Sequence, residues 1–265
     1  MEKQTLGIIF GNRDFFPDHL VTEARKDIQQ LFNKLDLEAV MLAESDTKLG
    51  GVETYREAAI CADLFKKHRE RIQGILVVLP NFGDEKGVAD TLKLAGLNVP
   101  VLIQGYPDEL DKLDPSRRRD AYCGKISVTK NLYQYAIKFS LTGKHVIHPS
   151  DPEFAGDLKK FVAVCRVVNG LKKVRIGAVG ARPGAFNTVR YSEKILQRNG
   201  ITVTTIDLSE ILGRAEKLSK GDNAVQSHLD KIREYASTGK TPDDRLVQIA
   251  KLDVVLKEFM EEQAL

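Results

Sequence analysis

The chain has 265 residues, which is enough for two α/β domains of moderate size. Its 40 Lys+Arg and 37 Asp+Glu give a formal net charge of +3, so the charge gives no reason to expect nucleic acid or a membrane surface as a partner. No apolar run reaches the roughly 18–20 residues that span a bilayer. The N-terminus shows no signal-peptide core, so we expect a cytoplasmic protein. The three cysteines form no Cys-x-x-Cys pair, which argues against a disulfide framework or a thiolate zinc site.

The first half of the chain alternates short apolar runs with amphipathic segments. Strands are predicted over 6–10, 38–42, 73–80 and 99–104, with a last short one inside 138–147. Helices are predicted over 18–34, 52–71, 86–96 and 122–135. This alternation at short spacing is typical of a doubly wound parallel sheet.

The second half begins after a proline-containing segment, 148–152, which is the best candidate for a linker. Strands are predicted over 174–179 and 201–206. Helices are predicted over 153–171, 187–199, 208–219 and 223–236, followed by one that Thr241 caps and that runs to Gln263. Two strands leave open sheet edges, so we expect that another subunit covers them or that the domain is truncated.

These patterns predict an α/β protein with two tandem Rossmann-like three-layer domains and parallel sheets, the second incomplete. The expected divisions are an N-terminal domain over 1–147, a linker and connecting helix over 148–171, and a middle domain over 172–265.

A polar and aromatic loop, GNRDFFPD, follows the first strand. Ligands of open α/β sheets bind at the carboxyl ends of the strands. The five N–H donors of Arg13 suit a polyhydroxylated ligand or a carboxylate, although pairing with Asp14 or Asp18 is an alternative. Phe15 and Phe16 can stack on a sugar face or, more simply, anchor the loop.

A second loop carries Arg182 and Asn187 and leads into the helix predicted to begin near 187. The free N–H groups of a helix N-terminus make phosphate binding conceivable there. However, the spacing of Gly177, Gly180 and Gly184 is not the dinucleotide pattern, and no P-loop follows.

Three further groups have simple structural explanations. Asn81, Asp84 and Glu85 can bind a hydroxyl or a metal, but acids here also cap a helix. Cys123 and the nearby histidines fit no short metal motif. The arginine run 117–119 is most simply a solvated helix start.

Four segments carry a family resemblance. They are GNRDFFPDHL at 11–20, NFGDE at 81–85, CGKISV at 123–128 and GARPGAFNTVRYSEK at 180–194. Together, in this order, they resemble the L-fucose isomerase family, specifically its shorter fucose isomerase-like members. Such enzymes have two Rossmann-like domains and a third that builds most of the active site. This sequence resembles only the first two.

The resemblance implies an aldose–ketose isomerase that works through an enediol with a divalent cation, typically Mn²⁺, held by Glu, Asp and His. It places those ligands beyond the region represented here, so we expect no catalytic residue, no metal ligand and no activity in this chain alone. It also implies a homo-oligomer, a trimer or hexamer, in which Arg13 reaches the substrate pocket of a neighbouring subunit. The predicted substrate-binding residues are Asn12, Arg13, Phe16, Arg182 and Asn187.

Two other functions remain open. Two Rossmann-like lobes also describe sugar-binding modules that perform no chemistry, although such modules normally have more than one crossover between lobes. The loop at 180–188 also allows an enzyme that acts on a phosphosugar or a nucleotide.

Overall fold

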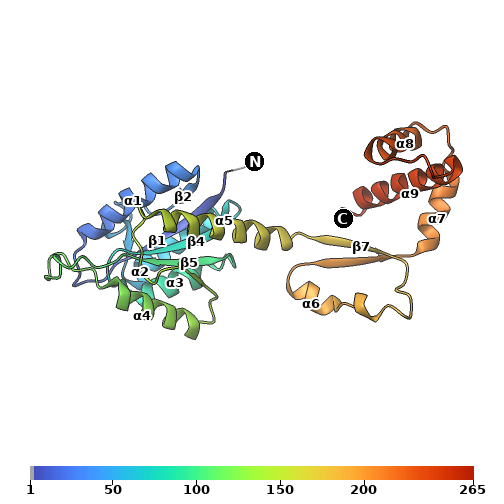
Figure 1. The fold of residues 1–265 in the computed structure, drawn as a ribbon. Coiled ribbons are helices and arrows are strands. Elements are labelled where there is room, and N and C mark those ends of the chain that lie inside the picture. The colour runs from blue at the N-terminus through green and yellow to red at the C-terminus, as the bar shows by residue number, and fades with distance from the viewer. Residues whose placement is uncertain (1–2) are drawn as a thin grey trace. The chain divides into compact units, whose positions relative to one another are not determined.

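The structure, a computed structural model, describes residues 3–265. Its contacts divide the chain into two units, one ending at Asn169 and one covering Gly170–Leu265. Both contain parallel strands flanked by helices, which confirms the predicted α/β class (Figure 1).

The first unit is built on a parallel sheet of six strands in the order β2-β1-β4-β5-β6, with β3 paired to the carboxyl end of β1. Its strands are β1 (Thr5–Gly11), β2 (Glu38–Val40), β3 (Gly51–Val52), β4 (Ile72–Leu79), β5 (Val101–Gly105) and β6 (Ser140–Leu141). The two central strands, β1 and β4, are buried along almost their whole length. They are apolar runs because helices cover both faces of a parallel sheet.

Helices form the outer layers of this unit. They are α1 (His19–Leu35), α2 (Tyr55–Lys67), α3 (Glu85–Ala95), α4 (Ala121–Gln134) and α5 (Pro152–Leu171). Side chains alternate along β1, so Leu6, Ile8 and Phe10 pack under α1 and α5, whereas Ile9 packs under α2, α3 and α4. The result is the three-layer arrangement that the sequence predicted.

Side-chain caps set two helix starts in this unit. Thr54 and Glu57 form a reciprocal capping box, and for this reason α2 begins at Tyr55 rather than at the predicted 52. The carboxylate of Asp84 accepts the backbone N–H of Gly87 at 2.6 Å, which confirms the capping role over a ligand role for this acid. A short 3₁₀ turn, η1 (Lys48–Gly50), precedes β3.

The second unit contains two parallel strands, β7 (Arg175–Val179) and β8 (Thr202–Ile206). Its helices are α6 (Glu193–Arg198), α7 (Leu208–Lys217), α8 (Asn223–Tyr235) and α9 (Asp243–Glu262). Ile206, Ile211 and Phe259 join β8, α7 and α9 in one small core. A second small core lies between α8 and α9.

Two predicted helix starts in this unit are wrong. The segment predicted as a helix from 187 forms only the 3₁₀ turn η2 (Asn187–Val189), and α6 begins at Glu193. The chain is extended at Arg190, and the hydroxyl of Ser192 accepts the N–H of Ile195, which sets the later start. At α9 the cap is Pro242, one residue after the predicted Thr241.

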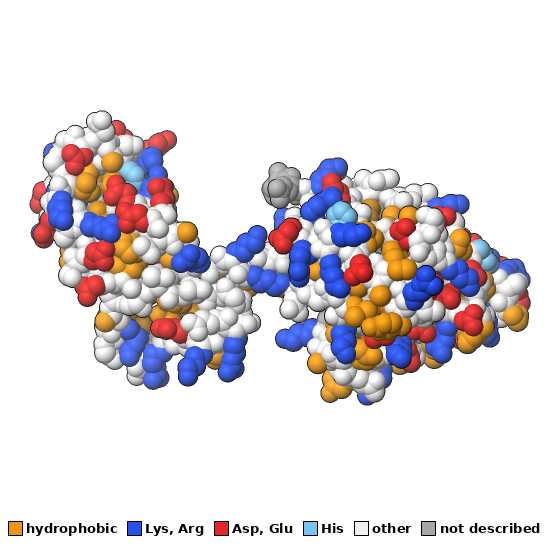
Figure 2. Space-filling view, turned by 180° about the vertical axis from the view of Figure 1, so that it is seen from behind, with side chains coloured by type: hydrophobic (Ala, Val, Ile, Leu, Met, Phe, Trp, Pro, Cys, Tyr) orange, Lys and Arg blue, Asp and Glu red, His pale blue; other side chains and the backbone are white. Residues whose placement is uncertain are grey.

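Charge is mixed over the surface. Figure 2 shows acidic and basic side chains interspersed on the visible face of the larger unit, in keeping with a net charge of +3. Within residues 3–265, no helix is both long enough and apolar enough to cross a bilayer.

Candidate functional site

The loops at the carboxyl edge of the first sheet are tied together by two asparagines. Asn81, after β4, donates to the side-chain oxygen of Asn12, after β1, at 2.6 Å. The backbone of the same two loops also meets, since the N–H of Asp84 donates to the Asn12 carbonyl at 2.8 Å. The loops 12–18 and 80–84 therefore form one joined surface.

Asn12 is fully buried beneath this surface and supports it through hydrogen bonds. Its amide donates to Asp18 at 2.8 Å and also to Glu53. Lys48 bridges the two carboxylates, at 2.8 Å from Asp18 and 3.6 Å from Glu53. Burial raises the pKa of Glu53, and Lys48 opposes that effect. Asn12 thus holds the loop, while its predicted contact with substrate stays a prediction.

Five residues at this edge form what we call the Arg–Phe cluster: Arg13, Phe15, Phe16, Phe82 and Arg118. Phe16 is buried, with 4% of its surface exposed, and stacks on Phe82 with ring centroids 5.8 Å apart. Phe15 lies against Phe16 at 4.9 Å but is 65% exposed. Phe16 therefore anchors the loop, and Phe15 presents an open aromatic face.

The two arginines of the cluster lie over its rings. The Arg13 guanidinium is 4.7 Å from the Phe82 centroid and 5.7 Å from that of Phe15. The Arg118 guanidinium is 4.9 Å from the Phe16 centroid. Such cation–π contacts fix the position of an arginine without using its N–H donors. Arg13 does not make the predicted alternative pair with Asp18, because Lys48 and Asn12 bind that carboxylate.

The prediction that 117–119 is a solvated helix start is wrong for most of the run. Helix α4 begins only at Ala121. The Asp108 carboxylate accepts the backbone N–H groups of residues 119 and 120, at 3.3 and 2.8 Å, in the turn before α4. Arg119 is 8% exposed and donates to the Pro80 carbonyl at 3.1 Å. The burial of Arg119 was missed in the sequence analysis. Its position in the loop after β5, at the carboxyl edge of the sheet, was the signal that could have indicated a role there.

The CGK segment at the start of α4 completes the edge. A Cβ on Gly124 would lie 1.8 Å from the Phe82 carbonyl oxygen, so only glycine lets α4 approach the loop 80–84. Lys125 is fully buried, and its ammonium donates to Thr142 at 2.7 Å and to the His145 carbonyl at 2.6 Å. Burial lowers the pKa of Lys125 to about 8. This lysine was also missed from sequence.

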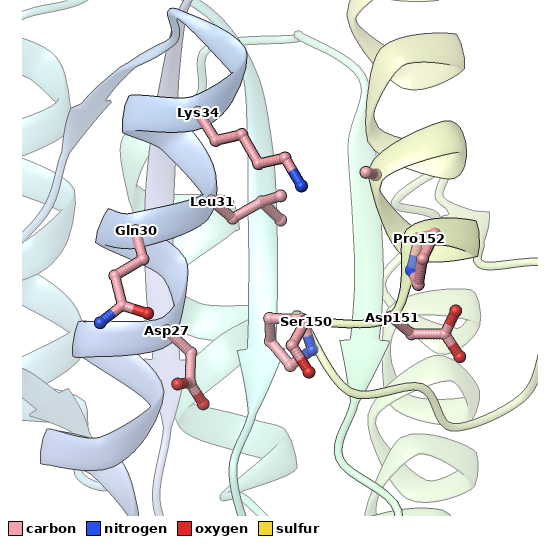
Figure 3. Close-up of a pocket in the computed structure, with 9 residues that line it drawn as sticks. Asp27, Gln30, Leu31, Lys34, Ser150, Asp151 and Pro152 are labelled. Atoms are coloured by element: carbon pink, nitrogen blue, oxygen red, sulfur yellow. The ribbon is translucent and has the colours of Figure 1, made fainter.

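A separate hollow of about 200 Å³ lies between α1 and α5 (Figure 3). Beside it, Asp27 accepts the Tyr106 hydroxyl at 3.0 Å and lies 3.4 Å from His148. The hydroxyl and the backbone N–H of Ser150 both lie within bonding distance of the same His148 nitrogen, at 2.8 and 3.2 Å. The serine is held in a local turn, so this group fastens the segment 148–152 to α1 rather than forming an activated nucleophile.

In the second unit, Arg182 and Asn187 shape their own loop. The Arg182 guanidinium donates to the carbonyls of Pro183 and Gly184 at 3.0 and 3.3 Å, and to the Asn187 side chain at 3.4 Å. All four residues are exposed. Whether these two side chains also contact substrate stays a prediction.

Metal ligation does not fit the residues present. Across residues 3–265, no three His, Cys, Asp or Glu side chains come together in a way that could hold a metal ion. We therefore derive no chemical step through Mn²⁺ from this chain.

Comparison with known proteins gives one family. Residues 7–172 match the model of the fucose/sulfoquinovose isomerase N-terminal domain. This stretch is more than half of the chain, and it contains every loop of the Arg–Phe cluster. No curated protein matched the sequence.

Proposed function

We propose, from the premise that the chain belongs to the fucose/sulfoquinovose isomerase family, that it presents substrate-contacting loops to an aldose–ketose isomerase. The contacting surface is the Arg–Phe cluster at the carboxyl edge of the first sheet. This edge is where open parallel sheets bind their ligands.

The observation that carries the proposal is the state of Arg13. Within residues 3–265, its guanidinium makes no ion pair or side-chain hydrogen bond, and stacking on Phe82 holds it in place. Its N–H donors therefore stay available to sugar hydroxyls. The exposed ring of Phe15 offers an apolar face that suits the C–H face of a sugar.

The isomerisation itself requires a divalent cation and its ligands, which we assign to residues outside this chain. A divalent cation such as Mn²⁺, when bound, would polarise the oxygens on the two reacting carbons. We propose that Glu, Asp and His residues outside this chain hold that ion, and that Arg13 acts across a subunit boundary of a homo-oligomer. On this proposal the chain alone does not interconvert sugars. Its cytoplasmic location and its trimeric or hexameric state stay predictions.

The test combines turnover with binding. The purified chain is assayed with fucose and sulfoquinovose in the presence of Mn²⁺, and no turnover is expected. NMR titration with the same sugars should show binding that Arg13→Gln weakens about tenfold, the loss expected for a charge-assisted hydrogen bond. Arg56→Gln, which changes an exposed arginine on α2, is the matched control and should change nothing.

Each outcome has a defined meaning. Robust turnover by the chain alone would overturn the proposal that residues outside this chain hold the cation. Equal binding by wild type and Arg13→Gln would remove Arg13 from the site. Tight metal-free binding would favour the alternative, a two-lobed sugar-binding module without catalysis.

A further inference from the structure

Arg118 has an unusual environment for a partly buried arginine. Its Nε atom is buried and has no hydrogen-bond partner in the described chain. The arginines on either side are both satisfied, because Arg117 pairs with Asp114 at 2.6 Å and Arg119 donates to Pro80 and Glu23. A buried N–H donor without a partner is uncommon in a folded protein and requires an explanation.

Two of the acids near Arg118 in sequence are bound to other groups. Asp108 accepts two backbone N–H groups, and Glu109 binds Lys112 at 2.5 Å. Within residues 3–265, no carboxylate forms an ion pair with the Arg118 guanidinium. Stacking on Phe16 at 4.9 Å holds this charge at the edge of the sheet.

Arg13, on the same cluster, also forms no ion pair with a carboxylate of residues 3–265. The Asp18 carboxylate in its loop is bound by Lys48 and Asn12. The hydrogen bond to Asp18 raises the pKa of Lys48, and the charge of Asp14 adds to this effect. Two unpaired guanidinium groups on one aromatic cluster make a local excess of positive charge, which attracts an anion.

The two arginines of the cluster lie on neighbouring rings. Arg13 lies on Phe82 and Arg118 lies on Phe16, and these two rings stack with centroids 5.8 Å apart. A ligand that reaches both guanidinium groups therefore needs polar groups at two separate positions, one for each arginine. A hexose with an oxyanion at one end has this form, since its hydroxyls and its charged group are apart.

We propose that Arg118 is a specificity-determining residue that binds the terminal oxyanion, a sulfonate or phosphate, of a charged sugar while Arg13 binds the hydroxyls. This inference rests on the proposed function, because it takes the ligand to be a sugar. Arginine suits the role, since its planar N–H groups bind sulfonate or phosphate oxygens in pairs. The site thereby favours a charged hexose over a neutral one.

The experiment is an NMR titration that observes the arginine Nε–H signals of the whole chain. The ligands are inorganic sulfate, sulfoquinovose, a hexose phosphate and the neutral sugar fucose. We expect the charged sugars to shift the Arg118 signal and to bind about tenfold more tightly than fucose. Arg118→Gln should abolish that preference. Whichever of the two charged sugars binds more tightly identifies the oxyanion.

The control variant is Arg117→Gln, which removes the same charge from the neighbouring, exposed arginine. Equal losses in Arg117→Gln and Arg118→Gln would show a general charge effect and overturn the assignment to Arg118. An Arg118→Gln variant that keeps its preference would overturn it too. Sulfate binding without sugar binding would refute the sugar assignment. Fucose binding that depends on Arg13, with no preference for charged sugars, would leave the proposed function standing and remove only this inference.

Discussion

Lys125→Met should remove a pH dependence from the stability of the first unit. The ammonium of Lys125 is fully buried, with Thr142 and the His145 carbonyl as its acceptors. Burial lowers the lysine pKa from 10.5 to about 8, and the negative charge of Asp157 opposes this effect without cancelling it. In the unfolded chain the same lysine titrates near its ordinary value, about 10.4.

The sign and size of the effect follow from these two pKa values. Between about pH 8 and pH 10.4 the unfolded chain binds more protons than the folded one, so the free energy of unfolding rises with pH in that window. Below about pH 8 the buried charge imposes its full cost. The gap between the two pKa values corresponds to at most about 3 kcal/mol, and partial relaxation of the site makes the measured rise smaller.

The assay is urea unfolding at several pH values, followed by pulse labelling of thiols. Cys61 and Cys165 are fully buried in the first unit and become reactive when that unit opens. The exposed Cys123 is replaced by serine in both proteins. The stability of the wild type relative to Lys125→Met should rise between about pH 7.5 and pH 10. Parallel stability curves for the two proteins would refute the reasoning.

Two further predictions concern the packing of the carboxyl edge. Gly124→Ala should destabilise the first unit by about 3 kcal/mol, because the new methyl group meets the Phe82 carbonyl. Gly156→Ala, at a helical position with nothing within 4 Å, should instead be neutral or stabilise by up to about 1 kcal/mol in the same thermal unfolding experiment. Asn12→Ala should cost about 2–3 kcal/mol, since it leaves Asn81 and two carboxylates without a buried partner. A loss below about 0.5 kcal/mol in urea unfolding would contradict the assigned role of Asn12.

Local sequence signals predicted most of the first unit. Strands β1 and β4 are apolar runs of the right length, and the burial of their side chains confirms them. The cap by Asp84 was predictable because a carboxylate at a helix start satisfies N–H groups only a few residues away. These features depend on neighbours in the sequence.

The remaining features depend on partners that are distant in the sequence. Nothing in the FF pair indicates that Phe16 is buried and Phe15 exposed, because that difference arises from Phe82 in another loop. The burial of Arg119 depends on Glu23, 96 residues away. The burial of Lys125 similarly depends on the segment 142–145. For this reason the sequence placed polar loops at the carboxyl edge of the sheet but indicated only part of the charged groups there.

The place of β1 within its sheet has a consequence for synthesis on the ribosome. This first strand pairs with β2, β3 and β4, all of which are made later. On one side, β1 is covered by α1 alone until α5, which begins at Pro152, has also emerged. Pairing between distant parts of a chain is slow to form. The nascent polypeptide therefore exposes part of this apolar strand until α5 has been made.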